Sequence, residues 1–143
     1  IVILTDADSD GHHIATLLLT FFYRYLPDLI RRGNVFLGMP PLYKIQIGDK
    51  THWAWDDAEK DRIVRDKTGR GTPDITRFKG LGEMDARLLW QTTMNPASRT
   101  ILKVVISDEL ETDRVVNDLM GKDPSARFRL VMERAAEADD LDV

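Results

Sequence analysis

The fold class is decided by Ile1-Val2-Ile3-Leu4-Thr5-Asp6-Ala7-Asp8-Ser9-Asp10-Gly11, an apolar run that gives way to three alternating aspartates. A short, continuous apolar run is typical of a strand buried on both faces, as in a parallel sheet. Apolar residues then recur at helical spacing from Ile14 to Tyr25, and Pro27 and Gly33 interrupt and end the helical segment. Strand, acidic turn and helix in this order predict an α/β fold with a parallel sheet flanked by helices.

The remaining sequence predicts alternating strands and helices followed by a helical tail. The expected elements are a strand at Val35–Leu37, a hairpin of Tyr43–Ile47 with Thr51–Trp55, a short polar helix capped by Asp56 and Glu59, a loop from Lys67 to Pro73, a strand from Ile75, a helix through Trp90, a helix opened by Asn95-Pro96, a strand at Leu102–Ile106, a helix ended by Gly121 and a last helix opened by Pro124.

Length and composition limit the classes of protein to which this chain can belong. A chain of 143 residues with 43% hydrophobic residues is of single-domain size and can bury a real core. It has no cysteine and no apolar run long enough to span a bilayer, and it begins with Ile1, so we expect a cytoplasmic fragment without a membrane partner whose upstream part is missing.

Charge is unevenly distributed along the chain. The net charge of −4 argues against a simple basic nucleic-acid-binding module. The segment between residues 62 and 79 is nevertheless locally basic. It is interpreted either as a phosphate-binding surface or as a solvated face, and the sequence does not decide between them.

The alternating aspartates point to a hard divalent cation. Carboxylates this close in a loop repel one another unless a cation lies among them, and Mg²⁺ prefers oxygen ligands. An EF-hand is excluded because loop position twelve, which should be a glutamate, is Leu17. A haloacid-dehalogenase-type phosphatase stays possible but expects threonine where Asp10 stands, and a purely capping role needs only one aspartate.

A family resemblance rests on four motifs in order. The stretch Thr5–Ile14 resembles the D-x-D-x-D-G element of the TOPRIM domain in the B-type subunits of bacterial type IIA DNA topoisomerases, gyrase and topoisomerase IV. Three further stretches look like signatures of the same subunits: Pro40–Lys44, Arg77–Met84 and Leu89–Pro96. The resemblance covers essentially the whole chain and leans toward gyrase.

The resemblance implies an organisation and an assembly. Residues 1–80 would be the C-terminal part of a Rossmann-like TOPRIM domain, and residues 81–143 the largely helical tail of the B-type polypeptide. An ATPase domain that uses ATP, a transducer domain and a catalytic glutamate would lie upstream. The implied partners are DNA and the A-type subunit, which supplies the attacking tyrosine within an A₂B₂ heterotetramer.

The resemblance also implies roles for individual residues. Asp6 and Asp8 would be catalytic and would bind Mg²⁺ in a two-metal site that shares one ligand from upstream, with Asp10 as a further ligand. The implied DNA-contacting residues are His13, Lys44, Arg77 and Lys79.

Several of these residues also have ordinary structural interpretations. His13 could equally be satisfied by the backbone at the helix start, and Glu83 could pair with Lys79 or cap the next helix. Gly80 and Gly82 lack side chains, which lets the backbone approach a ligand closely.

The function implied by the resemblance is Mg²⁺-dependent DNA cleavage and religation that changes DNA supercoiling, with this fragment inactive alone. Two alternatives remain open. One is a phosphatase with Asp6 as nucleophile, and the other is a non-catalytic interaction domain.

Overall fold

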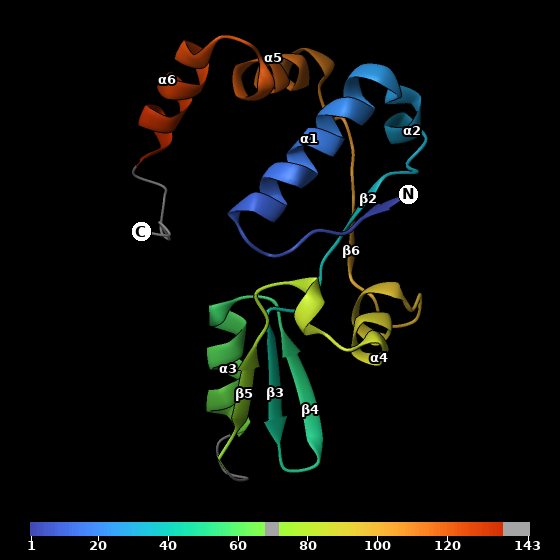
Figure 1. Cartoon of the computed structure of the whole chain (residues 1–143), viewed down its shortest axis with the longest axis vertical. Coiled ribbons are helices and arrows are strands. Elements are labelled where there is room, and N and C mark those ends of the chain that lie inside the picture. The colour runs from blue at the N-terminus through green and yellow to red at the C-terminus, as the bar shows by residue number, and fades with distance from the viewer. Residues whose placement is uncertain (68–71, 136–143) are drawn as a thin grey trace.

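The structure, a computed structural model, describes residues 1–67 and 72–135 and contains two small sheets with their own helices. Figure 1 shows one group of elements with β1, β2 and β6 and a second group with β3, β4 and β5, stacked along the long axis. The elements are β1 (Val2–Ile3), α1 (Ser9–Tyr25), α2 (Pro27–Arg31), β2 (Phe36–Gly38), β3 (Tyr43–Ile47), β4 (Lys50–Ala54), α3 (Asp57–Lys67), β5 (Asp74–Arg77), the 3-10 turn η2 (Leu81–Glu83), α4 (Ala86–Leu89), the π-helical turn η3 (Trp90–Met94), β6 (Ile101–Lys103), α5 (Glu109–Met120) and α6 (Pro124–Arg134).

The first sheet confirms the expected α/β start and adds an antiparallel strand. Its order is β1-β2-β6: β1 and β2 are parallel, whereas β6 pairs antiparallel with β2. The buried residues Ile3, Ala15, Ile30 and Val35 form its core, and the α1 side chains Leu19, Phe22 and Tyr23 pack against it. A mixed sheet of this kind is common where a chain returns to an otherwise parallel sheet.

The second sheet has the order β4-β3-β5, with both pairs antiparallel. The predicted hairpin is confirmed: β3 and β4 are joined by Gly48 and Asp49, and Gly48 has a φ of 58°, as the first position of a tight hairpin turn requires. Tyr43, Ile45 and Ile47 alternate as buried residues and pack with Ile63 and Val64 of α3. This alternation assigns one face of the sheet to the core and the other to polar groups.

Local capping confirms several predicted helix boundaries. Asp56 accepts the amide of Glu59 at 2.7 Å, and Glu59 accepts the amide of Trp55 at 3.2 Å, so the expected capping pair starts α3. Gly33, with a φ of 71°, follows α2, and Gly121 ends α5. Residues 68–71 of the expected loop lie outside the described residues.

The helix expected at Asn95-Pro96 is wrong. The chain makes a single turn there, in which the Asn95 side chain accepts the amide of Ala97 at 3.1 Å. A bond to the amide two residues ahead occurs in turns and also at helix N-termini, as Asp123 shows by accepting the amide of Ser125 at the start of α6. The strand β6 then begins at Ile101, so no helix can follow.

The helical tail is confirmed as α5 and α6. Arg31 pairs with Glu109 at 2.8 Å and Arg24 donates to Asn117 at 2.9 Å, so α5 contacts the helices of the first sheet. The division into 1–80 and 81–143 stays a prediction, and β6 of the second part completes the first sheet. In the described residues, no helix has the length and apolar character needed to cross a membrane.

Candidate metal centre at the acidic loop

The three aspartates of the acidic loop lie between β1 and α1, and all three are exposed. Asp8 is the N-cap of α1: its backbone is extended and its Oδ1 accepts the amide of Gly11 at 2.7 Å. Asp10 lies in the first turn of the helix, where the partial positive charge of the helix N-terminus favours a carboxylate. His13 directly follows His12 in α1 and is exposed.

Gly11 brings the helix against the loop backbone. A Cβ atom at this position would lie 2.1 Å from the carbonyl oxygen of Asp6, a distance that real Cβ atoms do not show. Any side chain here would therefore push the first turn of α1 away from the backbone of Asp6. Sequence reasoning missed this role of Gly11, although a glycine directly after a crowded acidic turn is a signal for close backbone approach.

A distant turn completes the surroundings of Asp6. The amide of Leu81 donates to Oδ1 of Asp6 at 2.8 Å across 75 positions of sequence. A Cβ atom on Gly80 would lie 3.0 Å from the Asp6 carboxyl carbon and from both of its oxygens. The sequence predicted that the backbone at Gly80 approaches a ligand closely. In the structure the group that lies close to Gly80 is the Asp6 carboxylate.

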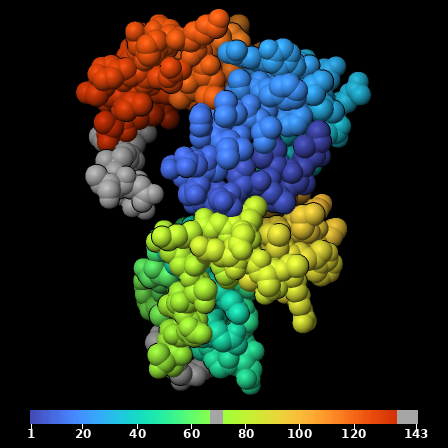
Figure 2. Space-filling model, in the orientation of Figure 1, coloured from blue at the N-terminus to red at the C-terminus, as the bar shows by residue number. Residues whose placement is uncertain are grey.

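Three of the four sequence motifs meet at this point. Ala7 of the acidic loop, the Pro40-Pro41 pair, and Phe78, Gly80, Leu81 and Met84 line one small cavity of about 10 Å³. A space of that size holds at most about one water molecule, so the three segments are packed together. Figure 2 shows the yellow-green segment against the blue N-terminal segment where the two parts of the molecule join.

The proposed DNA-contacting cations do not share one surface. The register pairs Arg77 with Tyr43 and pairs Lys44 with Thr76, one position along. Because successive side chains of a strand point to opposite faces, Arg77 lies on the Tyr43 face, which packs on α3, and Lys44 lies on the other. The Arg77 guanidinium is 5.9 Å from the centre of the Tyr43 ring.

Lys79 is the proposed DNA-contacting lysine that lies beside the acidic loop. It directly precedes Gly80 and is exposed. Its amide donates to Oε2 of Glu83 at 2.8 Å, so Glu83 pairs with Lys79 through the backbone. The alternative role of Glu83 as the next helix cap is wrong, because Asp85 caps α4 by accepting the amide of Leu88 at 2.9 Å.

Comparison with known proteins places this arrangement in a family. Residues 1–37 match the Toprim domain, and residues 70–132 match the carboxyl terminus of the DNA gyrase B subunit. The whole chain is 50% identical, over 146 residues, to the B subunit of DNA topoisomerase 4 from Bartonella bacilliformis. It is 47% identical, over 144 residues, to the DNA gyrase B subunit of Treponema denticola, again with the whole chain covered. The chain belongs to the DNA gyrase B and topoisomerase IV B family.

The match covers only part of each relative. The chain spans 21% of the Bartonella protein and 22% of the Treponema protein, about a fifth of the length of the curated relatives it matches. The DNA gyrase B subunit of Thermotoga maritima gives the same picture, with 46% identity over the whole chain and 22% of the relative covered. A membership of this kind gives no support to the phosphatase alternative.

The donor set of this gyrase B-like loop fits part of a divalent-metal site. Asp6 and Asp8 each accept a backbone amide with one carboxylate oxygen, and the second oxygen of each receives no hydrogen bond within residues 1–67 and 72–135. Those two oxygens are ligands of the kind that Mg²⁺ takes. The same described residues contain no group of three or more His, Cys, Asp or Glu side chains that could hold a metal ion.

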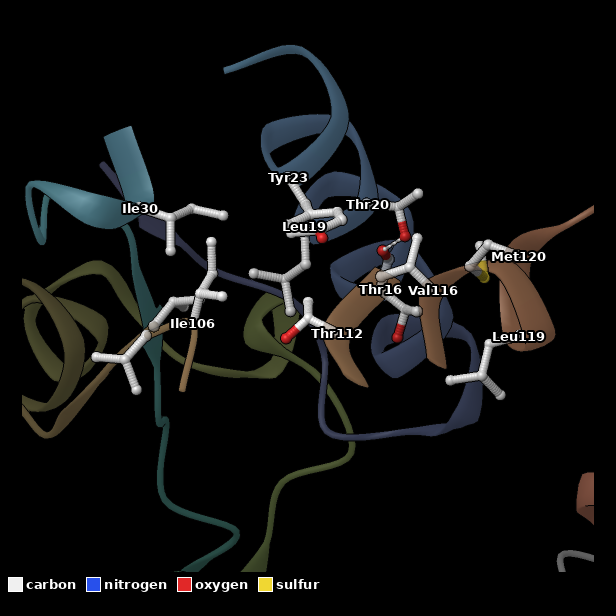
Figure 3. Close-up of a pocket in the computed structure, with 12 residues that line it drawn as sticks. Thr16, Leu19, Thr20, Tyr23, Ile30, Ile106, Thr112, Val116, Leu119 and Met120 are labelled. Carbon is white, nitrogen blue, oxygen red and sulfur yellow. Dashed lines mark hydrogen bonds between the residues drawn. The ribbon is translucent and has the colours of Figure 1, made fainter. Parts of the chain in front are cut away.

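A second cavity, of about 210 Å³, lies between α1 and α5 and contains none of the proposed site residues. Figure 3 shows Leu19, Ile106 and Val116 among its apolar lining. Its threonines donate to carbonyl groups at their own helices, as Thr16 does to His12 at 2.8 Å and Thr112 does to Asp108 at 2.6 Å. The lining therefore offers little polar chemistry, and the acidic loop remains the candidate centre of this family member.

Proposed function

We propose that this chain is part of the DNA gate of an ATP-dependent type IIA DNA topoisomerase, where it supports Mg²⁺-dependent DNA cleavage and religation. The observation that carries the proposal is the 2.8 Å hydrogen bond from Leu81 to Asp6. It brings the acidic loop together with the turn that follows β5 and carries Lys79. A phosphoryl-transfer site on DNA needs carboxylates that bind a metal ion. It also needs a positively charged side chain that binds phosphate.

The remaining parts of the reaction belong to other segments and partners. We propose that the A-type subunit supplies the tyrosine that attacks DNA, that ATP is used by another domain of the B-type polypeptide, and that the assembly is an A₂B₂ heterotetramer that changes DNA supercoiling. The gyrase and topoisomerase IV names borne by the relatives support this interpretation of the chain. Within it, residues 1–80 would serve as the TOPRIM part and residues 81–143 as the tail.

Asp6 and Asp8 would hold the cation through the oxygens that the backbone leaves unbonded, together with a carboxylate from upstream. When bound, Mg²⁺ supplies positive charge that neutralises the reacting phosphate and the leaving oxygen. The chain's own residues keep these carboxylates in place: Gly11 holds the loop against α1, and the Leu81 amide holds Asp6. Asp10 would act as a further ligand through water.

Lys79 is the lysine that we assign to the DNA backbone. It is exposed on the turn beside Asp6, and a lysine binds phosphate as a compact positive charge. His13, the fifth residue of α1, would contact a second phosphate. Lys44 and Arg77 would reach DNA only from opposite faces of the second sheet.

The test is DNA cleavage by the complete B-type polypeptide with its A-type subunit in Mg²⁺. Asp6→Ala and Asp8→Ala should each abolish cleavage. Asp49→Ala is the matched control, because Asp49 is an exposed aspartate in the β3-β4 turn and lies outside the proposed site. Cleavage at the control level in either acidic-loop variant would contradict the proposed function.

A further inference from the structure

The turn from Lys79 to Met84 is held in shape by its own hydrogen bonds. Glu83 donates its amide to the carbonyl of Gly80 at 3.2 Å, and Met84 donates to the carbonyl of Leu81 at 3.2 Å. The Glu83 carboxylate closes the turn by accepting the amide of Lys79 at 2.8 Å. These bonds leave the amide of Leu81 to point outward, and that amide is the one that donates to Asp6.

Buried residues anchor both ends of this turn. Phe78 and Met84 are 7% and 8% exposed, and the amide of Phe78 donates to the carbonyl of Leu42 at 2.8 Å. The turn is therefore a fixed extension of the second sheet. Asp6, in contrast, is an exposed residue of a loop that leaves the first sheet, so its carboxylate depends on a neighbour for a single orientation.

Gly80 leaves space beside the Asp6 carboxylate, whereas its backbone conformation does not call for glycine. Gly80 has a φ of −151° and a ψ of 165°, an extended conformation that any residue adopts. A Cβ atom would lie 3.0 Å from the carboxyl carbon and both oxygens of Asp6, so the carboxylate would have to move by a few tenths of an ångström. Gly82 differs, because a Cβ atom there meets nothing within 4 Å.

We propose that Gly80 and the amide of Leu81 are a positioning element for the Asp6 carboxylate, which ties the metal-binding loop of one sheet to the other. The amide fixes one oxygen and leaves the second for the cation, and the bare Gly80 leaves the carboxylate the room to take this orientation. This inference rests on the proposed function of Asp6. Groups that orient a metal ligand change metal affinity or activity by about 10–100-fold when they are altered.

The test compares Gly80→Ala with its matched control Gly82→Ala in the complete B-type polypeptide. Mn²⁺ affinity is measured by electron paramagnetic resonance without DNA, and the Mg²⁺ concentration for half-maximal DNA cleavage is measured with the A-type subunit. Gly80→Ala should weaken Mn²⁺ binding and raise the half-maximal Mg²⁺ concentration, each by about tenfold or more. Gly82→Ala should stay within about twofold of the unchanged protein, since its added methyl group meets open space.

A second variant covers the case in which Gly80→Ala unfolds. Glu83→Ala removes the acceptor of the Lys79 amide without adding an atom near Asp6, so it loosens the turn and should weaken Mn²⁺ binding several-fold. If Gly80→Ala folds and binds Mn²⁺ as Gly82→Ala does, or if a folded Glu83→Ala binds it unchanged, the positioning element is refuted. Asp6→Ala separates the two ideas: normal cleavage in that variant refutes the proposed function itself.

Discussion

Asp8 combines two roles that one pair of substitutions separates. As the N-cap of α1 it accepts the amide of Gly11 at 2.7 Å, and as an exposed carboxylate we propose that it binds the divalent cation. Asparagine caps a helix about as well as aspartate does, whereas alanine does not. Asp8→Asn therefore keeps the cap and removes the charge, and Asp8→Ala removes both.

The magnitude follows from the cap. Losing an N-cap hydrogen bond costs about 1 kcal/mol, which is about a fivefold change in the local opening equilibrium. Hydrogen exchange of the first turn of α1 should therefore speed up by at least about fivefold in Asp8→Ala, which loses the charge as well as the cap. In Asp8→Asn it should change less, because only the favourable interaction of the charge with the helix dipole is lost, about 0.3–1 kcal/mol.

Asp108 provides the control, since it caps α5 in the same way by accepting the amide of Glu111 at 2.8 Å. Asp108→Ala and Asp108→Asn should reproduce the exchange pattern in α5 and leave Mn²⁺ affinity unchanged. Both Asp8 variants should lose Mn²⁺ affinity by about tenfold or more, although only one loses the cap. Unchanged Mn²⁺ affinity in Asp8→Asn would reduce Asp8 to a capping residue and refute the reasoning.

Three further predictions concern the loop, the cations and the second sheet. Gly11→Ala should disrupt the acidic loop and lower both the stability of the protein and its Mn²⁺ affinity, because the added Cβ would lie 2.1 Å from the carbonyl oxygen of Asp6. Calorimetry and Mn²⁺ titration measure these two effects. A variant that is stable and binds Mn²⁺ normally contradicts the prediction. Lys79→Ala should weaken DNA binding and lower the slope of log affinity against log salt by about one; salt titrations of DNA affinity measure this, and an unchanged slope contradicts the assignment of Lys79. Lys60 lowers the pKa of Asp57 below its ordinary 3.8, so the stability that the charged form contributes is present above pH 3.8 and is lost as the pH falls through the lowered pKa. The difference in melting temperature between the unchanged protein and Asp57→Asn should shrink over that range, and a difference that is independent of pH argues against the pair.

Local patterns predicted most of the elements because the decisive signals are local. The apolar run before Asp6 predicted β1, and the Gly48-Asp49-Lys50 stretch predicted a hairpin. In the structure the turn contains only Gly48 and Asp49, and this two-residue turn fixes the register of β3 and β4. The error at Asn95 has the same local origin. A cap and a turn both use the asparagine side chain to bind a nearby amide, and only the early start of β6 selects the turn.

Local sequence patterns could not predict the contacts between distant segments. Residues 48 and 49 set the register between β3 and β4, but β5 is separated from β3 by the whole of α3. A shift of one residue would place Arg77 opposite Lys44 on the same face, whereas the observed register places Arg77 opposite Tyr43. The sequence named Lys44 and Arg77 as DNA-contacting residues without placing them on a face of the sheet, and the pairing puts them on opposite faces.

The acidic loop and the turn from Lys79 to Met84 lie together where the two sheets meet. Asp6 leaves the first sheet and the Leu81 amide extends from the second, so the orientation of the carboxylate depends on how the two sheets dock. A single hydrogen bond to a charged group contributes about 1.5–3 kcal/mol, too little to hold two sheets together but enough to select one orientation of a short side chain. The packed Pro40, Pro41 and Phe78 supply the docking, and the amide supplies the orientation. The proposed metal ligand is thus set by the joint between the two sheets, and a disturbance of that joint should reach Asp6 before it reaches Asp8, whose partner lies in its own helix.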